Sequence, residues 1–288
     1  MARDETLLAL YGTTEPPAEQ CTLSAGPLRV VVENGALRGI SWRGVEVVRG
    51  IQCLVRDTNW GTYQADDATE RFEEGDGGFR YERRFVIDGA RMSGAFIAEG
   101  EAAGRVRVEA ELRAAAAFDT NRAGLTLLHP VLGVAGEPVE IRHVDGSVEK
   151  SRFPATISPS EPARDMAGLS HRIGTVEGSI AFEGVEFDME DQRNWTDASY
   201  KTYCRSLFRP WPYRIEAGET IRQAIMIGLT DAAGASAAAG TTAEGGTLSL
   251  VPGAGRLPEV SLVLDPEWPR APEPELTALG VRTFVARV

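Results

Sequence analysis

Apolar and polar side chains alternate along most of the chain between Leu28 and residue 230. In residues 105–114, for example, every second side chain is apolar and most of the others are charged, as in a strand with one buried face. Strands of this kind are predicted over residues 28–33, 36–42, 45–57, 79–88, 92–101, 105–114, 124–129, 139–146, 178–184, 185–190 and 221–230. Asn34-Gly35 is a strong hairpin signal, and convincing helices are almost absent before residue 270. The pattern predicts a mainly β fold in which two antiparallel sheets pack face to face.

The pattern changes after Thr230. Residues 231–247 are rich in Ala, Gly and Thr and show no hydrophobic period, which is typical of a linker or a long surface loop. Beyond it, the chain is predicted to form a strand, a helix and a strand, over residues 257–265, 272–280 and 281–288. One such unit cannot bury its own faces, so it either packs on the β domain or begins a further α/β domain, and we expect the second. The predicted organisation is a β domain over 1–230, a linker over 231–247 and the start of an α/β domain over 248–288.

Composition and charge exclude several classes of protein. The formal net charge of −12 argues against a nucleic-acid binder, because phosphate contacts need concentrated Lys and Arg. No stretch is apolar for long enough to span a membrane, and the first residues lack the apolar run of a signal peptide. The 3 cysteines are odd in number and widely spaced, which favours reduced thiols over a disulfide framework. We therefore expect a cytoplasmic protein.

A polar segment over residues 186–203, EFDMEDQRNWTDASYKTY, interrupts the strand pattern. It combines five carboxylates with two cations, two amides and four aromatic side chains. A packed core does not need so many groups that are costly to bury unpaired. Aromatic walls around convergent polar groups suit a polyol or a sugar. The candidates in this segment are Glu190, Asp191, Arg193, Asn194, Trp195, Asp197, Lys201 and Tyr203. The alternative is an internally paired corner between strands. Trp60, in the turn RDTNWGTY, is expected to wall the same cleft.

Histidines offer a second set of candidates. His143 and Asp145 are two residues apart on a predicted strand, so their side chains share a face and form a candidate general base with its carboxylate, or a pair that stitches a strand end. His129 and His143 with one of Asp145, Glu190 or Asp191 would match a facial metal triad, but the spacing does not require a metal. No serine elbow, phosphate loop or dinucleotide fingerprint occurs, so no cofactor is expected.

Three long segments carry a resemblance to a known family. NRAGLTLLHP, HVDGSVEKSRFPATISPSEP and EGVEFDMEDQRNWTDASYKTYC occur in this order, and the opening LRVVVENGALRGISWRGVEVVRGIQCLVRDTNWGTY matches too. Together they resemble the D-apionate lactonases of bacterial apiose catabolism, over residues 22–288. The resemblance implies a β-supersandwich similar to galactose mutarotase, followed by a barrel-like α/β domain that would begin near the end of this chain. It also implies hydrolysis of D-apionolactone to the open acid.

The first functional hypothesis is therefore a sugar-acid lactonase, or its amino-terminal domain. A base would activate water, a cation would stabilise the oxyanion, and a second acid would hold the base or protonate the leaving alkoxide. The candidates are Asp191 or His143 for the base, Arg193 with Asn194 or Lys201 for the oxyanion, and Glu190 or Asp145 for the second acid, with Asp197 beside them. Predicted substrate contacts are Trp60, Asn194, Trp195, Lys201 and Tyr203. The other hypotheses are a non-catalytic carbohydrate-binding or scaffold domain and a mutarotase-like epimerase. The expected partner is a small sugar lactone. Formation of a homo-oligomer is compatible with the sequence.

Overall fold

The computed structural model describes residues 6–8, 10, 12–195, 198–232, 261–264 and 283–286. The chain forms two compact units, Met1–Gly240 and Thr241–Val288. The first unit contains eighteen described strands, one short 3-10 helix and α-helical residues at positions 6–8 and 10, and the second contains two described strands. The candidate chemistry of the sequence lies in the first unit.

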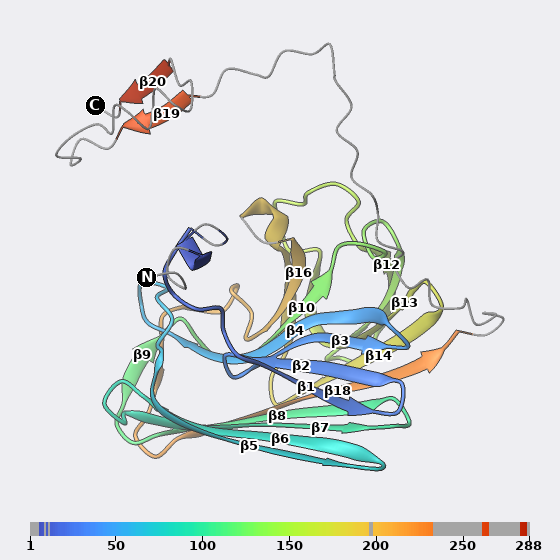
Figure 1. Ribbon diagram of the computed structural model, residues 1–288, viewed down its shortest axis with the longest axis horizontal. Helices are drawn as coiled ribbons and strands as arrows, with labels where there is room; N and C mark the ends of the chain where they lie inside the picture. The colour runs from blue at the N-terminus through green and yellow to red at the C-terminus, as the bar shows by residue number, and fades with distance from the viewer. Residues whose placement is uncertain are drawn as a thin grey trace. The chain divides into compact units, whose positions relative to one another are not determined.

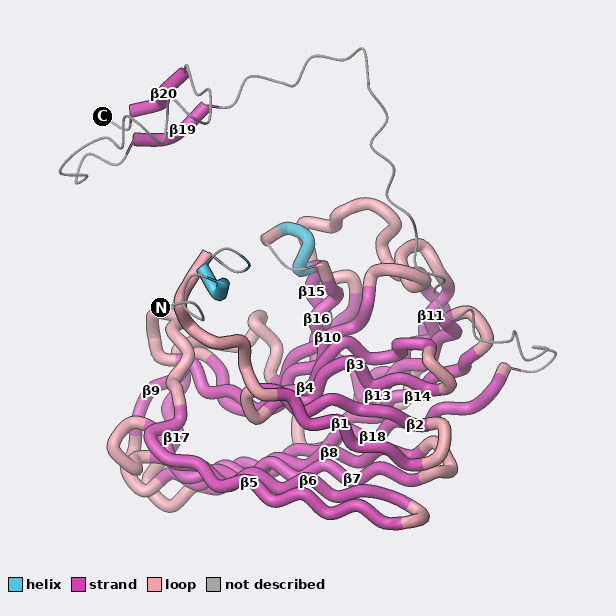
Figure 2. Tube along the Cα trace, viewed as in Figure 1, coloured by secondary structure: helices cyan, strands magenta, loops and turns pink. Residues whose placement is uncertain are grey.

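Antiparallel strands make up the first unit (Figures 1 and 2). They are β1 (Gln20–Ala25), β2 (Leu28–Glu33), β3 (Ala36–Trp42), β4 (Val45–Arg56), β5 (Ala65–Gly75), β6 (Gly78–Ile87), β7 (Met92–Glu101), β8 (Arg105–Ala114), β9 (Phe118–Thr120), β10 (Arg122–Pro130), β11 (Pro138–His143), β12 (Val148–Arg152), β13 (Ala163–Ile173), β14 (Val176–Glu183), β15 (Phe187–Asp191), β16 (Ser199–Cys204), β17 (Tyr213–Ile215) and β18 (Thr220–Asp231). The turn η1 (Gln192–Asn194) joins β15 to the segment before β16.

Most of these strands belong to one continuous sheet. Its order is β1-β2-β3-β4-β10-β16-β15-β13-β14-β18-β8-β7-β6-β5, with β11 added beside β13 and β12 beside β11. The sheet folds over, so that the layer of β1 to β4 lies above the layer of β5 to β8 (Figure 1). The two predicted layers are thus parts of a single hydrogen-bonded sheet. The small β9–β17 pair stands apart from it.

The core lies between these layers and is built from the apolar half of each alternating strand. On β8, Val106, Val108 and Leu112 are at most 2% exposed, whereas Arg107 and Glu111 between them are exposed. Phe79 and Leu28 meet beside Gly100, where a Cβ atom would come within 3 Å of both side chains. That close approach requires the glycine, and it shows how tightly the two layers pack.

The structure confirms the mainly antiparallel β prediction, and the strands over 92–101 and 105–114 have the predicted bounds. Asn34 and Gly35 both have positive φ, 50° and 71°, as the predicted two-residue hairpin turn requires. Seven strands were not predicted: β1, β5, β9, β12, β13, β16 and β17. The clearest case is β5, where ten of eleven residues are exposed. As the last strand in the sheet order it needs no apolar face, and its charges suit an unpaired edge.

In the second unit, β19 (Ser261–Leu264) and β20 (Thr283–Ala286) pair in parallel. Both fall within predicted strands, and a parallel pair is what a strand-helix-strand unit forms. The predicted helix over 272–280 and the predicted linker over 231–247 lie outside the described residues, apart from Asp231 and Ala232. The boundary between the two predicted domains stays a prediction. None of the helices in the described residues is long and apolar enough to cross a membrane.

Candidate functional site

The polar segment over 186–203 folds into a hairpin at the middle of the sheet. β15 pairs with β16, β16 pairs with β10, and β10 pairs with β4. Because side chains alternate along a strand, the hairpin divides its polar residues between two faces. Asp191 and Tyr200 are register partners and share the core-facing side, whereas Glu190 and Lys201 are partners on the opposite side.

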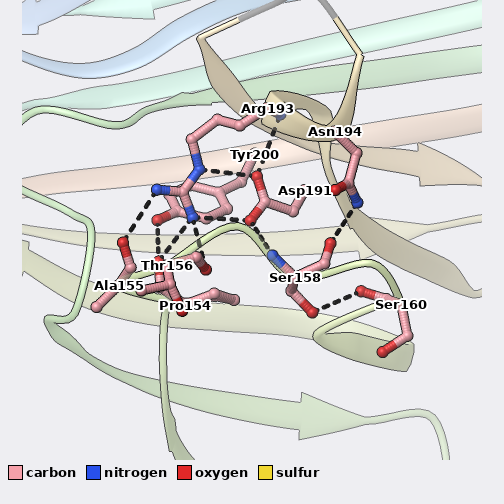
Figure 3. A network of polar contacts seen from close by, with 9 residues as sticks. All are labelled: Pro154, Ala155, Thr156, Ser158, Ser160, Asp191, Arg193, Asn194 and Tyr200. Atoms are coloured by element: carbon pink, nitrogen blue, oxygen red, sulfur yellow. Dashed lines mark hydrogen bonds and ion pairs between the residues drawn. The ribbon is translucent and has the colours of Figure 1, made fainter.

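On the core-facing side, Asp191 and Arg193 form a nearly buried ion pair (Figure 3). Arg193 Nη2 donates to Asp191 Oδ2 at 2.7 Å and Nε donates to Oδ1 at 2.9 Å. The Asp191 side chain is fully buried and that of Arg193 is 16% exposed. The Ser158 amide donates to the same carboxylate at 2.9 Å. Two oxygens therefore accept four hydrogen bonds, counting the one from the Arg193 amide.

The remaining donors of Arg193 hold the loop that follows β12. Its guanidinium donates to the carbonyls of Pro154, Ala155 and Thr156, at 2.9 to 3.2 Å. The guanidinium also lies over the Tyr200 ring, 5.0 Å from its centroid, and the Tyr200 hydroxyl donates to the Pro154 carbonyl at 2.6 Å. The Asn194 amide donates to the Ser158 carbonyl in the same network (Figure 3). This cluster clamps the loop to the hairpin.

The electrostatics of the clamp agree with that role. Burial alone raises the pKa of the Asp191 carboxyl, but hydrogen bonds from Arg193 and from the Ser158 amide outweigh it, so the pKa lies below its ordinary value. A carboxylate that is fully buried and already accepts these bonds is a poor base toward water. Arg193 likewise has few donors left for an oxyanion. The geometry therefore favours the paired corner for these two residues, and their predicted catalytic roles lose support.

On the opposite side, Glu190 and Lys201 form an ion pair that stays partly accessible. Lys201 Nζ donates to Glu190 Oε1 at 2.7 Å, and the side chains are 13% and 20% exposed for Lys201 and Glu190. Gln192 also donates to Oε1. Burial lowers the pKa of Lys201, and the charges of Arg122 and Arg56 lower it further, against the opposing effect of Glu190. Three cations therefore share this region with the Glu190 carboxylate.

We call this side of β4, β10, β16 and β15 the cationic face. It consists of Arg56, Arg122, Asp188, Glu190, Lys201 and Tyr203, which the strand register places on one side of the sheet. Figure 2 shows β4, β10, β16 and β15 next to one another, as the sheet order requires. The Arg122 guanidinium stacks on the Tyr203 ring at 3.9 Å from its centroid and lies 5.5 Å from the Trp60 ring centroid.

Aromatic side chains from two loops extend this face. Trp60 lies in the loop after β4, and its ring meets that of Trp211 edge to face, with centroids 5.3 Å apart. Arg56 Nη1 donates to the Trp60 carbonyl at 2.8 Å, which ties the loop to the cationic face. The combination of cations, one accessible carboxylate and aromatic rings can bind a polar ring that carries negative charge.

Several buried polar atoms on this face have no hydrogen-bond partner among the described residues. They are Arg56 Nε, Arg122 Nε and Nη2, Thr126 Oγ1, Asp188 Oδ2 and Tyr203 OH. Buried polar groups are normally paired, so a cluster of unpaired ones marks a place for a polar ligand or for water. Burial also raises the pKa of Asp188.

The structure does not join His143 to the other candidates. Its Nδ1 lies 3.0 Å from the Arg164 carbonyl oxygen and its Nε2 lies 3.4 Å from Glu149 Oε2. Asp145 instead accepts hydrogen bonds from the amide and hydroxyl of Ser147, at 2.8 and 2.6 Å, and these bonds lower its pKa. In the structure His143 therefore contacts Glu149 rather than Asp145, and the role of Asp145 as its orienting carboxylate loses support. The nearest carboxylate to the imidazole is that of Glu149.

His129 lies in the core rather than at a sheet edge. It is fully buried, its Nε2 is 2.8 Å from Thr202 Oγ1, and its ring lies 6.0 Å from that of His171. Within the described residues, no group of three or more His, Cys, Asp and Glu side chains is arranged to hold a metal ion. The facial triad considered from the sequence is not assembled there.

The predicted substrate contacts are divided between the cationic face and the clamp. Lys201, Tyr203 and Trp60 belong to the cationic face, Asn194 belongs to the clamp, and Trp195 is 75% exposed. Asp197 lies outside the described residues. Arg56, Arg122 and Trp211 were not among the residues predicted from the sequence. The signal in the sequence was a charged residue, Arg122, two residues before the apolar run of the strand predicted over 124–129.

Comparison with known proteins identifies the family of the first unit. Residues 8–232 match the family described as the D-apionate lactonase N-terminal domain. The chain belongs to this family. The resemblance inferred from the sequence is confirmed.

A curated member of the D-apionate lactonases matches the chain as well. The D-apionate lactonase of Brucella anthropi is 39% identical over 266 residues, which are 91% of this chain and 44% of that protein. The chain therefore spans less than half the length of this relative.

Solved structures share the fold of this D-apionate lactonase domain at low identity. A galactose 1-epimerase from Lactobacillus acidophilus NCFM has a TM-score of 0.51 and 6% identity, with 74% of this chain and 95% of that chain covered. The Slr1438 protein from Synechocystis sp. PCC 6803 has a TM-score of 0.50 and 10% identity, with 75% and 97% covered. At these identities the likeness concerns the fold alone. It confirms the predicted galactose-mutarotase-like supersandwich.

Proposed function

We propose that this chain is the amino-terminal part of an enzyme that hydrolyses D-apionolactone to D-apionate, and that the cationic face takes part in the reaction. Membership of the family and the name of the B. anthropi relative support the substrate. The observation that carries the site is the Glu190–Lys201 ion pair, which is partly accessible and lies beside two further cations.

In this proposal Glu190 is the base. Lys201 and Gln192 both donate to Oε1, and in the described part of the chain no hydrogen bond reaches Oε2. Oε2 takes a proton from water as the water oxygen attacks the lactone carbonyl carbon. Lys201 and Arg122 stabilise the negative charge on the carbonyl oxygen. The bond from that carbon to the ring oxygen then breaks, and the leaving alkoxide takes up the proton. The product is the open hydroxy acid, whose carboxyl group then releases its own proton to solvent.

The experiment is lactone hydrolysis by this 288-residue chain. A pH-indicator assay follows acid release from D-apionolactone and from other aldonolactones, with and without a chelator, and the full-length B. anthropi lactonase is the positive control. Turnover by the chain supports the proposal, and its loss with chelator would add a metal. A folded chain without turnover contradicts a self-sufficient site here and moves the chemistry to the rest of a longer protein.

A non-catalytic role in binding a sugar acid is the second candidate. It is favoured by the excess of cations over accessible carboxylates on the cationic face. An epimerase has no such support, because one fold hosts many functions and the likeness to galactose 1-epimerase concerns the fold alone.

A further inference from the structure

Two arginines of the cationic face stand opposite each other across neighbouring strands. Arg56 on β4 and Arg122 on β10 are direct register partners in the antiparallel ladder. Like charges at directly opposed positions destabilise a sheet, because their Cβ atoms lie about 5 Å apart. The arrangement therefore costs stability unless something else in this place compensates the charge.

No side chain in the described ranges compensates it directly. Neither Arg56 nor Arg122 takes part in an ion pair there, whereas Arg193 and Arg209 each hold a carboxylate within 2.7 Å. The carboxylates of Glu190 and Asp57 act on Arg56 at longer range, but Glu190 is hydrogen-bonded to Lys201 and Asp57 accepts from the Asn59 and Gly61 amides. A buried cation is normally paired, so the buried Arg122, with the half-buried Arg56 opposite it, is an exception that calls for an anion.

Arg122 is also held in place with donors to spare. Only 3% of its surface is exposed, and its guanidinium is stacked on Tyr203 and faces Trp60. Its Nε and Nη2 groups have no acceptor among the described residues. These are neighbouring donors on one planar fork, which is the geometry that binds a carboxylate in a bidentate way. Arg56 is partly exposed and is the member of the pair that solvent reaches.

Hydroxyl groups lie next to the arginine pair on the same face. Thr126 and Tyr203 are register partners on β10 and β16, both are fully buried, and their hydroxyl oxygens have no partner among the described residues. Their position suits the hydroxyls of a polyol chain. The ring of Trp60 offers an apolar surface for C–H groups.

We propose that Arg56 and Arg122 form a carboxylate-binding subsite for a sugar acid, the product class of the proposed hydrolysis. The Arg122 fork binds the carboxylate, Arg56 adds the second positive charge, and Thr126 and Tyr203 bind hydroxyls. The open acid then binds more tightly than the uncharged lactone, and it inhibits its own formation. This inference rests on the proposed function for the identity of the acid, but its binding can be measured without turnover.

The test is isothermal titration of this chain with potassium D-apionate, D-apionolactone and sodium phosphate at pH 7. We expect D-apionate to bind at least tenfold more tightly than the lactone or phosphate. Arg122→Leu and Arg56→Gln should each weaken D-apionate binding at least tenfold. Arg113→Gln, at an exposed position of β8, should leave it unchanged. Because Arg56 is partly exposed, we expect Arg56→Gln to fold. It therefore tests the subsite even if Arg122→Leu does not fold.

Two results would overturn the subsite. One is D-apionate binding that both folded arginine variants retain at wild-type strength. The other is phosphate that binds as tightly as D-apionate, which would indicate a simple anion site. The outcome is separate from that of the proposed function. A chain that binds D-apionate through Arg56 but does not turn over lactone retains the subsite and loses the catalytic proposal. A chain that hydrolyses the lactone but neither binds D-apionate nor is inhibited by it retains the catalytic proposal and loses the subsite.

Discussion

Glu190 on β15 and Lys201 on β16 are register partners, and their side chains meet at 2.7 Å on the side of the hairpin opposite to Asp191. One residue further along the same ladder, Asp191 is fully buried and bound to Arg193. The alternation of a strand thus separates two ion pairs that are adjacent in sequence. One holds a loop in place, and the other stays within reach of a ligand.

We expect Glu190→Gln to lower lactone hydrolysis by roughly 100-fold or more, because it removes the proposed base while keeping the shape of the side chain. Lys201→Met should lower it as well, since it removes a charge that stabilises the oxyanion. The measurement is the initial rate of acid release from D-apionolactone. Glu183→Gln, at an exposed position of β14, is the matched control and should leave the rate unchanged. Wild-type rates in both Glu190→Gln and Lys201→Met would exclude the cationic face as the catalytic site.

Asp191→Asn should act on stability. It leaves the Arg193 guanidinium without its carboxylate in a site where only 16% of that side chain is exposed. Breaking such a pair costs about 3–5 kcal/mol of unfolding free energy. Urea denaturation followed by circular dichroism measures this loss. We expect a lower midpoint and an unchanged dependence of the unfolding free energy on urea concentration. Asp145→Asn, which removes a carboxylate bonded only to Ser147, should leave the midpoint in place. An Asp191→Asn protein of wild-type stability without activity would restore Asp191 as the catalytic base.

His143→Ala should retain lactone hydrolysis. The imidazole contacts the Arg164 carbonyl and the Glu149 carboxylate, and the Glu190–Lys201 pair is held by other residues. The measurement is the rate of acid release beside that of Glu190→Gln, with circular dichroism to show that both variants are folded. A loss in His143→Ala as large as in Glu190→Gln would return His143 to the reaction.

The strands that the sequence predicts are those with one apolar face. Residues 92–101 and 105–114 bury every second side chain against the opposite layer, and the period of two is visible without a structure. β5 and β16 have no such pattern. β5 is an exposed edge, and β16 is buried on both faces, so its sequence does not alternate between apolar and polar residues. Periodicity does not detect either case.

The sequence predicted which segment carries the candidate site, but it did not predict which side chains would lie together in space. Composition drew attention to residues 186–203, and it did not show that Asp191 and Glu190 would face opposite sides of a sheet with different partners. Arg56 and Arg122 are 66 residues apart in sequence and meet only through the β4–β10 register. Such pairs depend on topology, and a single sequence without its strand order does not provide it.

The buried histidines predict a fold that weakens in mild acid. His129 and His171 are both buried, and Phe153 packs against both rings. His129 Nδ1 and both ring nitrogens of His171 have no partner among the described residues. Burial lowers the pKa of His171 from 6.5 to about 4, and burial with the neighbouring ring lowers that of His129 well below 6.5.

Below pH 6.5 the unfolded chain therefore takes up protons that the folded chain does not, and the free energy of unfolding falls until the pH nears about 4. Each group contributes at most about 1.4 kcal/mol per pH unit. Urea midpoints between pH 7 and pH 5 measure the slope, and His171→Leu should make it shallower. Phe153→Leu alters the packing of the same cluster without removing a titrating group, so it should lower the midpoint at every pH and leave the slope unchanged. A His171→Leu protein with the wild-type slope would show that His171 takes up its proton in the folded state as readily as in the unfolded chain.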